Sequence, residues 1–135
     1  MCGMNPTIFK AYDIRGKYPE EINENAVSEI IAVLAKHFGK GRIVVAHDAR
    51  LSSPALYKSA LQSLKISPPA GGSKLEIIVV GPTTTPMLYF LVNKLKAVGG
   101  IMVTASHNPK EFNGLKIVGK KAAPISGEEI KKWII

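Results

Sequence analysis

The hexapeptide from Thr104 to Pro109, TASHNP, places a hydroxyl, an imidazole and a carboxamide beside a proline. Ser106 follows the end of an apolar run, so its hydroxyl could face a crevice beyond a buried strand. An Asn-Pro turn can also leave backbone N–H groups free to face an anion. The alternative is that Asn108 and Pro109 only turn the chain and that Ser106 is a solvated loop serine. Because Asn-Pro turns are common, the hexapeptide taken alone favours that alternative.

Charged side chains elsewhere in the chain could bind or neutralise such an anion. His107 and Lys116 could supply positive charge or transfer a proton. Arg15 and Arg50 each stand two residues after an aspartate, and a guanidinium binds phosphate through a fork of parallel donors. The alternative is a structural Asp-Arg pair that braces a loop. For Arg50 the pattern favours this structural role, because loop ties of that kind are common, whereas for Arg15 the two interpretations are balanced.

Other phosphate and acyl chemistries are disfavoured by the motifs. Ser106, His107 and Asp48 supply the residue types of a Ser-His-Asp hydrolase. However, adjacent Ser and His side chains diverge in an extended chain, and the G-x-S-x-G nucleophile elbow is absent. The P-loop pattern and the G-x-G-x-x-G fingerprint are also missing from the sequence. We therefore expect neither hydrolysis nor nucleotide binding through those motifs.

Composition restricts the class of protein and its partners. The 135 residues carry a formal charge of +8, which favours anionic partners. Basic residues are not gathered in one block or interleaved with aromatic residues, so we expect no nucleic-acid partner. The single cysteine, Cys2, excludes an internal disulfide. No signal peptide and no apolar run of about 20 residues is present, so we predict a cytoplasmic protein that does not bind membranes.

Alternating helix and strand patterns must position these residues. Helical periodicity and capping residues predict four helices. The first covers Ala26 to Phe38, and the second begins at Ser52-Ser53-Pro54 and ends at the break formed by Ser67 to Ser73. The third follows the turn at Gly81 to Pro86 and ends at Lys94, and the fourth begins at Ser126. Short apolar runs predict strands at Arg42 to Ala46, Leu75 to Val80 and Gly100 to Ala105, a fourth and more exposed one at Leu115 to Val118, and an additional one within Lys10 to Arg15.

This order predicts a single domain over residues 1–135. We expect an α/β fold, a three-layer α/β/α sandwich around a mixed, mainly parallel sheet of about four strands. In such sheets, ligands bind beyond the carboxyl ends of the strands. The loops at His47 to Ser53, Gly81 to Pro86 and Ser106 to Gly114 are therefore the expected place for the site.

Taken together, the motifs resemble one family. The chain is similar, from Ile8 to about Ile130, to the first domain of the α-D-phosphohexomutase superfamily, in the phosphomannomutase/phosphoglucomutase branch. The resemblance rests on four ordered motifs and a fifth that fits them, namely YDIRG at Tyr12 to Gly16, DARLSSP at Asp48 to Pro54, TTP at Thr84 to Pro86, TASHNP at Thr104 to Pro109 and NGLK at Asn113 to Lys116.

The resemblance implies that Ser106 carries the transferred phosphoryl group as a phosphoserine. It implies interconversion of the 1-phosphates and 6-phosphates of mannose or glucose, with hexose phosphates as ligands and a hexose 1,6-bisphosphate as the intermediate. An oxygen of the Ser106 phosphate would complete the coordination of a Mg²⁺ ion. Lys116 and Arg15 would surround the phosphoserine and the reacting hydroxyl, with Lys116 assisting proton transfer. His107 and Asn108 would flank the serine, and Tyr12 would lie beside the two cations.

The motifs of the family's second, third and fourth domains are missing, including the acidic loop that supplies the other Mg²⁺ ligands. The resemblance therefore implies that the remaining domains, or a split-protein partner, complete the enzyme, and that the isolated chain is inactive. The alternative is a non-catalytic module that binds phosphorylated sugars or a protein through the same loops.

Overall fold

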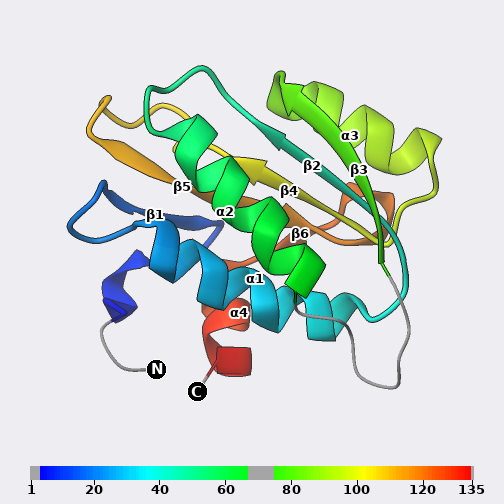
Figure 1. The fold of residues 1–135 in the computed structure, drawn as a ribbon, viewed down its shortest axis with the longest axis horizontal. Coiled ribbons are helices and arrows are strands. Elements are labelled where there is room, and N and C mark those ends of the chain that lie inside the picture. Colours follow the sequence, from blue (N-terminus) through cyan, green and yellow to red (C-terminus); the bar gives the residue numbers. More distant parts are fainter. Residues whose placement is uncertain (1–3, 67–74, 135) are drawn as a thin grey trace.

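Two long helices form one layer of the computed structural model, which describes residues 4–66 and 75–134. Helix α1 (Glu24–Phe38) begins at Asn23, whose side chain accepts the Ala26 N–H, and ends at Gly39 with a φ of 72°. Helix α2 (Ser53–Ile66) packs beside it, and both lie on the same face of the sheet (Figure 1). The two predicted helices are confirmed. Cys2 and the predicted break at 67–73 lie outside the described residues.

A mixed sheet forms the middle layer. Its order is β1-β5-β4-β2-β3, with β6 also paired to β5. Strands β3, β2 and β4 run parallel to one another, whereas β5 is antiparallel to β4, β1 and β6. The strands are β1 (Ile14–Lys17), β2 (Gly41–His47), β3 (Leu75–Pro82), β4 (Gly99–Val103), β5 (Phe112–Val118) and β6 (Pro124–Ile125).

The sheet confirms the predicted α/β/α class and corrects its details. Within residues 4–66 and 75–134 it has six strands rather than about four. The strand at Leu115 to Val118 was predicted to be the more exposed one, but β5 is largely buried because it has partners on both sides. Strand β3, predicted to be buried, is half-exposed because β2 is its only partner among the described strands, and Val79 is 61% exposed there.

Helix α3 (Thr85–Lys94) forms the layer on the opposite face. It begins at Thr84, whose side chain accepts the Met87 N–H, as the sequence predicts. The helix packs against β2, β4 and the short 3-10 turn η3 (Lys120–Ala122). On the same face of β1 and β5, Arg15 and Lys116 remain partly exposed, whereas Val118 at the end of β5 is buried with α3.

The two ends of the described chain lie on the α1 side of the molecule (Figure 1). A 3-10 turn, η1 (Pro6–Ile8), precedes β1. Helix α4 (Gly127–Ile134) packs against α1, and its predicted cap is present because the Ser126 hydroxyl accepts the Glu129 N–H. Trp133 on α4 stacks on His37 of α1, with 3.8 Å between the ring centroids.

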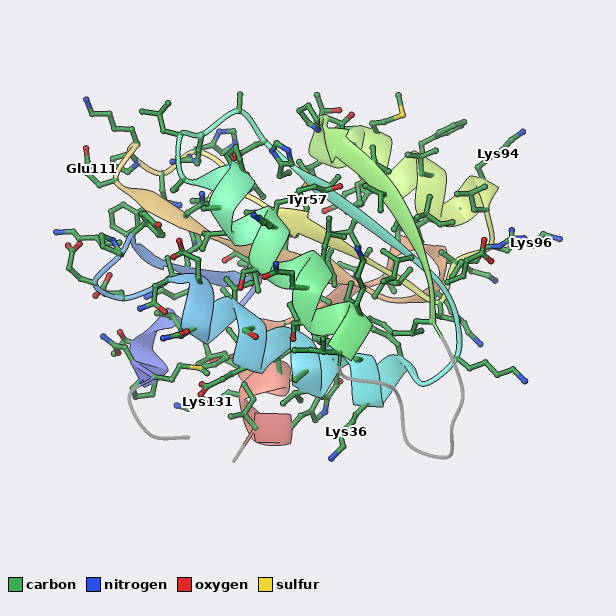
Figure 2. All side chains as sticks on the ribbon, in the orientation of Figure 1. Lys36, Tyr57, Lys94, Lys96, Glu111 and Lys131 are labelled. Atoms are coloured by element: carbon green, nitrogen blue, oxygen red, sulfur yellow. The ribbon has the colours of Figure 1, made fainter. Side chains whose placement is uncertain are left out.

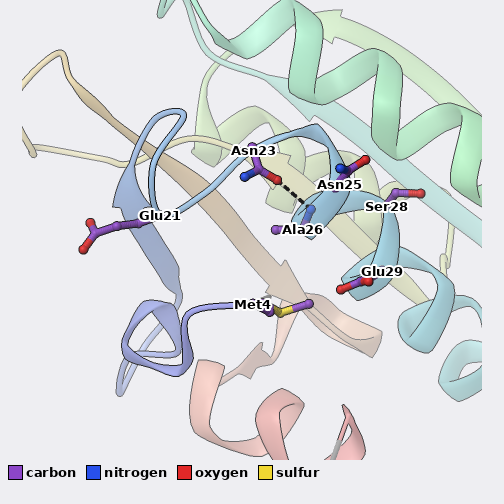
Figure 3. A pocket seen from close by; sticks show the side chains of 7 residues that line it. All are labelled: Met4, Glu21, Asn23, Asn25, Ala26, Ser28 and Glu29. Atoms are coloured by element: carbon purple, nitrogen blue, oxygen red, sulfur yellow. Dashed lines mark hydrogen bonds between the residues drawn. The ribbon is translucent and has the colours of Figure 1, made fainter. Parts of the chain in front are cut away.

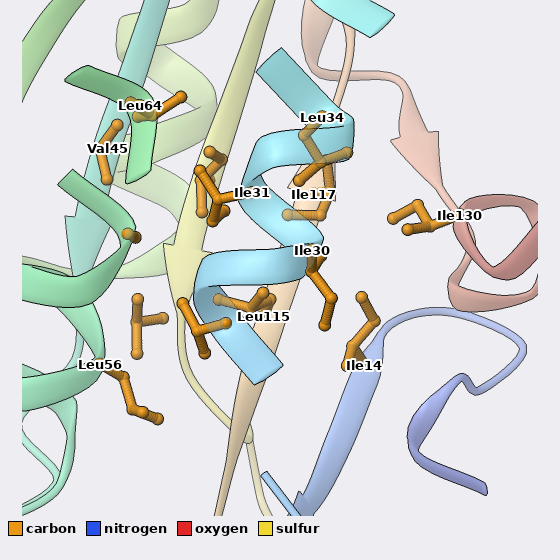
Figure 4. Packing of buried hydrophobic residues seen from close by; sticks show 14 of the residues in the cluster. Ile14, Ile30, Ile31, Leu34, Val45, Leu56, Leu64, Leu115, Ile117 and Ile130 are labelled. Atoms are coloured by element: carbon orange, nitrogen blue, oxygen red, sulfur yellow. The ribbon is translucent and has the colours of Figure 1, made fainter. Parts of the chain in front are cut away.

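The larger hydrophobic core lies between the sheet and helices α1, α2 and α4 (Figure 4). Each fully buried Leu or Ile side chain contributes roughly 1.5–3 kcal/mol to stability relative to an exposed one. Ile14 of β1 and Leu115 and Ile117 of β5 belong to this core. Because side chains alternate along a strand, the intervening residues of β1 and β5 project to the opposite face. The core therefore fixes the two strands from which Arg15 and Lys116 project.

Surface charge is spread over several elements. Lys36, Lys94 and Lys131 project outward from three different helices (Figure 2). Among the helices of residues 4–66 and 75–134, none combines the length and the apolar character needed to cross a membrane.

Candidate functional site

The candidate site lies at one edge of the sheet. Strands β2 and β4 are parallel, so their carboxyl ends at His47 and Val103 share this edge. Strand β5 is antiparallel to β4 and begins at the same edge with Phe112. The loop that joins β4 to β5 therefore lies beside the loop that follows β2. Between the two loops is an open crevice of about 420 Å³, lined by Asp48, Ala49, Arg50, Ser106, Asn108 and Lys110.

Ser106 occupies an unusual backbone conformation in this crevice. Its φ is 57°, in the left-handed region that costs a residue with a side chain roughly 1–2 kcal/mol. Its N–H donates to the Thr104 hydroxyl at 3.0 Å. The residue is exposed, and its own hydroxyl makes no hydrogen bond to the described residues. A strained residue with a free hydroxyl is the kind of feature that active sites retain.

Arg50 ties the β4–β5 loop to the β2 loop. A guanidinium has five N–H donors, and all five are used. The Nε donates to the Asp48 carboxylate at 3.2 Å. The four remaining donors reach backbone carbonyl oxygens of the β4–β5 loop at 2.8–3.0 Å, those of Ser106, Asn108, Pro109 and Phe112. Arg50 therefore has no donor left for a ligand, which confirms the structural alternative for this residue.

Asp48 is the centre of a second set of hydrogen bonds. Its carboxylate accepts from the hydroxyls of Ser53 and Thr104 at 2.5 and 2.7 Å and from the Arg50 N–H at 3.0 Å. Burial alone would raise the pKa of this carboxyl. The hydrogen bonds from Ser53, Thr104 and the Arg50 backbone, together with the charge of Arg50, outweigh burial and hold the pKa below its ordinary value. Asp48 is therefore a fixed anion near neutral pH.

The sequence reasoning gave no role to three members of this network, namely Ser53, Thr104 and Asn113. The buried Asn113 side chain donates to the hydroxyls of Ser52 and Ser53 at 2.8 and 3.0 Å. The only local signal is that Ser52 and Ser53 follow Asp48 closely in the sequence. Nothing in the sequence shows that Thr104 and Asn113 would meet them, because those contacts span 56 to 61 residues.

Arg15 uses its guanidinium very differently from Arg50. Its Nε donates to Asp13 at 2.7 Å, and its side chain remains 31% exposed. Its four terminal N–H donors have no partner among the residues that the structure describes. Arg15 therefore keeps a free fork for an anion, as one of its two interpretations requires.

Lys116 lies near Arg15 on the α3-side face of the sheet. Arg15 is opposite Gly114 in the β1–β5 ladder, so Lys116 is its diagonal neighbour on the same face, and such pairs lie about 7–8 Å apart. Lys116 forms no salt bridge within the described part of the chain. Two cations without full compensation therefore share a partly exposed area of this face.

Gly114 permits the close approach of β1 and β5. A Cβ atom at this position would overlap the Ile14 carbonyl oxygen and lie 3.0 Å from the Arg15 Cα atom. No side chain can be accommodated there unless the strands separate. The glycine of the Asn113-Gly114 dipeptide thus sets the register that places Arg15 beside Lys116.

The other predicted site residues differ in how they are held. Tyr12 is 77% exposed. His107 is exposed and makes no hydrogen bond to the described residues. The Asn108 side chain donates to the Ala105 carbonyl at 2.8 Å, and its N–H donates to the same carbonyl at 3.1 Å. Asn108 therefore stabilises the turn, whereas Tyr12 and His107 are available to a ligand.

The described residues do not form a magnesium site by themselves. Mg²⁺ takes six oxygen ligands, of which proteins usually supply one or two carboxylates while waters and substrate phosphates supply the others. No group of three or more His, Cys, Asp or Glu residues able to hold a metal ion occurs in residues 4–66 and 75–134. The nearby carboxylate, that of Asp48, is occupied by its own hydrogen bonds. The donor set of this chain does not fit the ion unless further ligands are supplied.

A second pocket, of about 320 Å³, lies at the start of α1 (Figure 3). Its lining contains the two carboxylates of Glu21 and Glu29 and the amides of Asn23 and Asn25, and none of the described lysines or arginines. An anionic ligand would be repelled there. The crevice beside Ser106 is the better phosphate site because its lining contains Lys110 together with Ser106.

The fold and the loop geometry define a three-layer α/β/α domain with an exposed serine beside cationic residues. The family model described as "Phosphoglucomutase/phosphomannomutase, alpha/beta/alpha domain I" matches residues 6–134. The chain belongs to this family, which confirms the resemblance found in the sequence.

Relatives and solved structures agree with this assignment. The chain is 45% identical over 120 residues to "Phosphohexose mutases" of Xanthomonas campestris pv. campestris (strain B100), covering 89% of the chain and 25% of that protein. It is 43% identical to a "Phosphomannomutase" of Klebsiella pneumoniae, covering 90% of the chain and 74% of that protein. The chain thus spans about a quarter of the length of the Xanthomonas relative.

The structural likeness is equally extensive. A phosphoglucomutase/phosphomannomutase family protein from Burkholderia thailandensis superposes with a TM-score of 0.80 at 31% identity, covering 96% of the chain and 29% of that structure. A putative phosphomannomutase from Thermus thermophilus gives 0.76 at 30% identity, covering 97% of the chain and 30% of that structure.

Proposed function

We propose that this chain is the domain of a hexose-phosphate mutase that carries the transferred phosphoryl group on Ser106. The observation that carries this proposal is the free hydroxyl of Ser106, held in a strained loop at the sheet edge, while Arg15, on β1 of the same sheet, has terminal donors that no described residue accepts. Family membership and the names of the relatives support mutase chemistry.

The proposed reaction has two transfers. In the first, the bond between phosphorus and the Ser106 Oγ breaks as a free hydroxyl of a hexose monophosphate bonds to phosphorus; that hydroxyl loses its proton and the Ser106 Oγ gains one. The product is a hexose 1,6-bisphosphate. In the second, the phosphate at the other position returns to the Ser106 Oγ, which loses its proton, and the sugar oxygen that is released gains one. The net result moves a phosphate between positions 1 and 6 of mannose or glucose, and the phosphoserine is regenerated.

Phosphoryl transfer depends mainly on alignment and charge compensation. Arg15 is suited to grip a phosphate with its terminal fork. Lys116 is the candidate to take and return the hydroxyl proton, and His107 can add charge beside the serine. Tyr12 can contact the sugar from the rim. Mg²⁺ remains a prediction, and no step is routed through it because the described residues do not hold it alone.

The test follows phosphate on the protein. The longest form of the protein that its coding sequence supplies is incubated with hexose 1,6-bisphosphate, and its intact mass is measured. We expect one added phosphoryl group in the wild type and none in Ser106→Ala. Ser59→Ala is the matched control, because this serine lies on α2 and donates to the Glu24 carbonyl, away from the sheet edge.

Phosphate persisting on Ser106→Ala would contradict the assignment of the carrier. Hexose bisphosphate that binds, as measured by calorimetry, without any transfer to the wild type would favour the non-catalytic module instead.

A further inference from the structure

Arg50 has no donor left for a ligand, yet it is bound closely to the loop that contains Ser106. Four of its five N–H groups hold backbone carbonyl oxygens of that loop, at 2.8–3.0 Å. The loop is therefore anchored to Arg50 through its peptide groups and not through its side chains. An anchor of this kind determines which way the peptides face.

In a trans peptide the C=O and the following N–H point in opposite directions. The Ser106 carbonyl points to Arg50, so the His107 N–H points away from it. The Pro109 carbonyl also points to Arg50, so the Lys110 N–H points away as well. Neither N–H has an acceptor among the residues that the structure describes. Arg50 thus holds four carbonyl oxygens of the loop on its own side and leaves the His107 and Lys110 N–H groups pointing away from it.

We propose that Arg50 is a positioning residue for phosphoryl transfer, because it gathers the carbonyl oxygens of the Ser106 loop and turns the His107 and Lys110 N–H groups toward an incoming phosphate. A carbonyl oxygen facing a phosphate would repel it, whereas a free N–H stabilises it. This inference rests on the proposed function, since it assumes that Ser106 carries the phosphoryl group. Arg50 itself does not touch the substrate.

A lysine cannot replace Arg50 in this role. Its three donors radiate from one nitrogen, whereas the guanidinium fork spreads five donors in a plane. The four carbonyls and the Asp48 carboxylate need all five. Arg50→Lys therefore keeps the positive charge but releases the loop. The variant distinguishes the effect of loop positioning from the effect of the charge of Arg50.

The first experiment does not depend on catalysis. Amide hydrogen exchange is measured on this chain for Arg50→Lys and for Arg42→Lys. Arg42 is a matched control because it is half-exposed and lies on the strand that precedes Arg50, at the end remote from the site. We expect the Ser106, Asn108 and Phe112 amides, which are hydrogen-bonded within the loop, to exchange about tenfold faster in Arg50→Lys alone, with the β4 amides unchanged.

The second experiment measures phosphoryl uptake by Ser106 from hexose 1,6-bisphosphate in the longest form of the protein. Because Arg50 has no donor for the substrate, we expect Arg50→Lys to slow uptake about 100-fold at saturation while the half-saturating concentration changes by less than about threefold. Arg42→Lys should match the wild type. Asp48→Asn, which weakens the Arg50 Nε contact and the hydrogen bonds from Ser53 and Thr104 but leaves the four carbonyl bonds of Arg50, should give a smaller change of the same kind.

Equal exchange in Arg50→Lys and Arg42→Lys, or faster exchange spread evenly over β4, would overturn the positioning role. So would normal uptake by Arg50→Lys, or a loss confined to the half-saturating concentration. If Arg50→Lys does not fold, Asp48→Asn decides by the same two measurements. If even the wild type takes up no phosphate, the proposed function fails, and the exchange measurement still decides whether Arg50 holds the loop.

Discussion

The two Asp-x-Arg segments of this chain are alike in sequence and opposite in use. In the loop after β2, Arg50 is 14% exposed and all five of its donors are occupied. In β1, Arg15 is 31% exposed and uses only its Nε, on Asp13. One guanidinium is part of the framework and the other is available to a ligand. Whether an arginine can bind phosphate is therefore indicated by the number of its free N–H donors, and not by the presence of an aspartate nearby in the sequence.

The largest expected difference between the two arginines is in stability. We expect Arg50→Ala to lower the free energy of unfolding by about 5 kcal/mol, because it removes five hydrogen bonds, four of them to the Ser106 loop, and takes the cation away from Asp48. Arg15→Ala removes one hydrogen bond but leaves the Asp13 carboxylate, which is 5% exposed, without its cation, and should cost about 3 kcal/mol. Urea denaturation of both variants measures the difference. Equal losses would break the distinction between a framework arginine and a ligand-binding one.

The next largest effect is on affinity and concerns the other arginine. Arg15→Ala should weaken the binding of hexose 1,6-bisphosphate about tenfold, because a bidentate charge-assisted contact is lost. Arg42→Ala removes the same charge far from the site and should leave the affinity unchanged. Isothermal titration calorimetry provides the comparison. If both variants lose affinity equally, the phosphate responds to net charge and not to the free guanidinium fork.

The smallest effect is the pH dependence of the Asp48 network. The folded pKa of Asp48 lies below its ordinary value, so its stabilising contribution is complete above the unfolded pKa of about 3.9 and is lost as the pH falls through the folded pKa. Urea denaturation at pH 6 and pH 3 should therefore show a larger acid loss in the wild type than in Asp48→Asn. An identical acid loss would show that Asp48 is not the group responsible.

Local rules were sufficient to predict much of the fold. Asn23, Thr84 and Ser126 cap the helices as predicted because each bond is made within three residues of the cap. Strand burial was harder. β5 is covered because β4 and β1 pair with it, and β3 is half-exposed because, among the strands that the structure describes, only β2 pairs with it. Such pairing depends on distant segments and leaves no trace in a short apolar run.

The candidate site shows the same division. Its exposed chemistry, Ser106 with Arg15 and Lys116, is visible in the sequence as motifs. The hydrogen bonds that hold the Ser106 loop cannot be recognised in the sequence. The Arg50 contacts reach residues 56 to 62 positions later and end on backbone carbonyls, which no residue type identifies. The donor count that distinguishes Arg50 from Arg15 became available only with the structure.

The missing Cβ of Gly114 also restricts how this protein can vary. Alanine is the smallest possible replacement, and its Cβ atom would already overlap the Ile14 carbonyl oxygen. Separating β1 from β5 would displace Arg15 and also draw Ile14 away from Leu115 and Ile117 in the core that they share. One missing methyl group thus couples the placement of a surface cation to the packing of the interior.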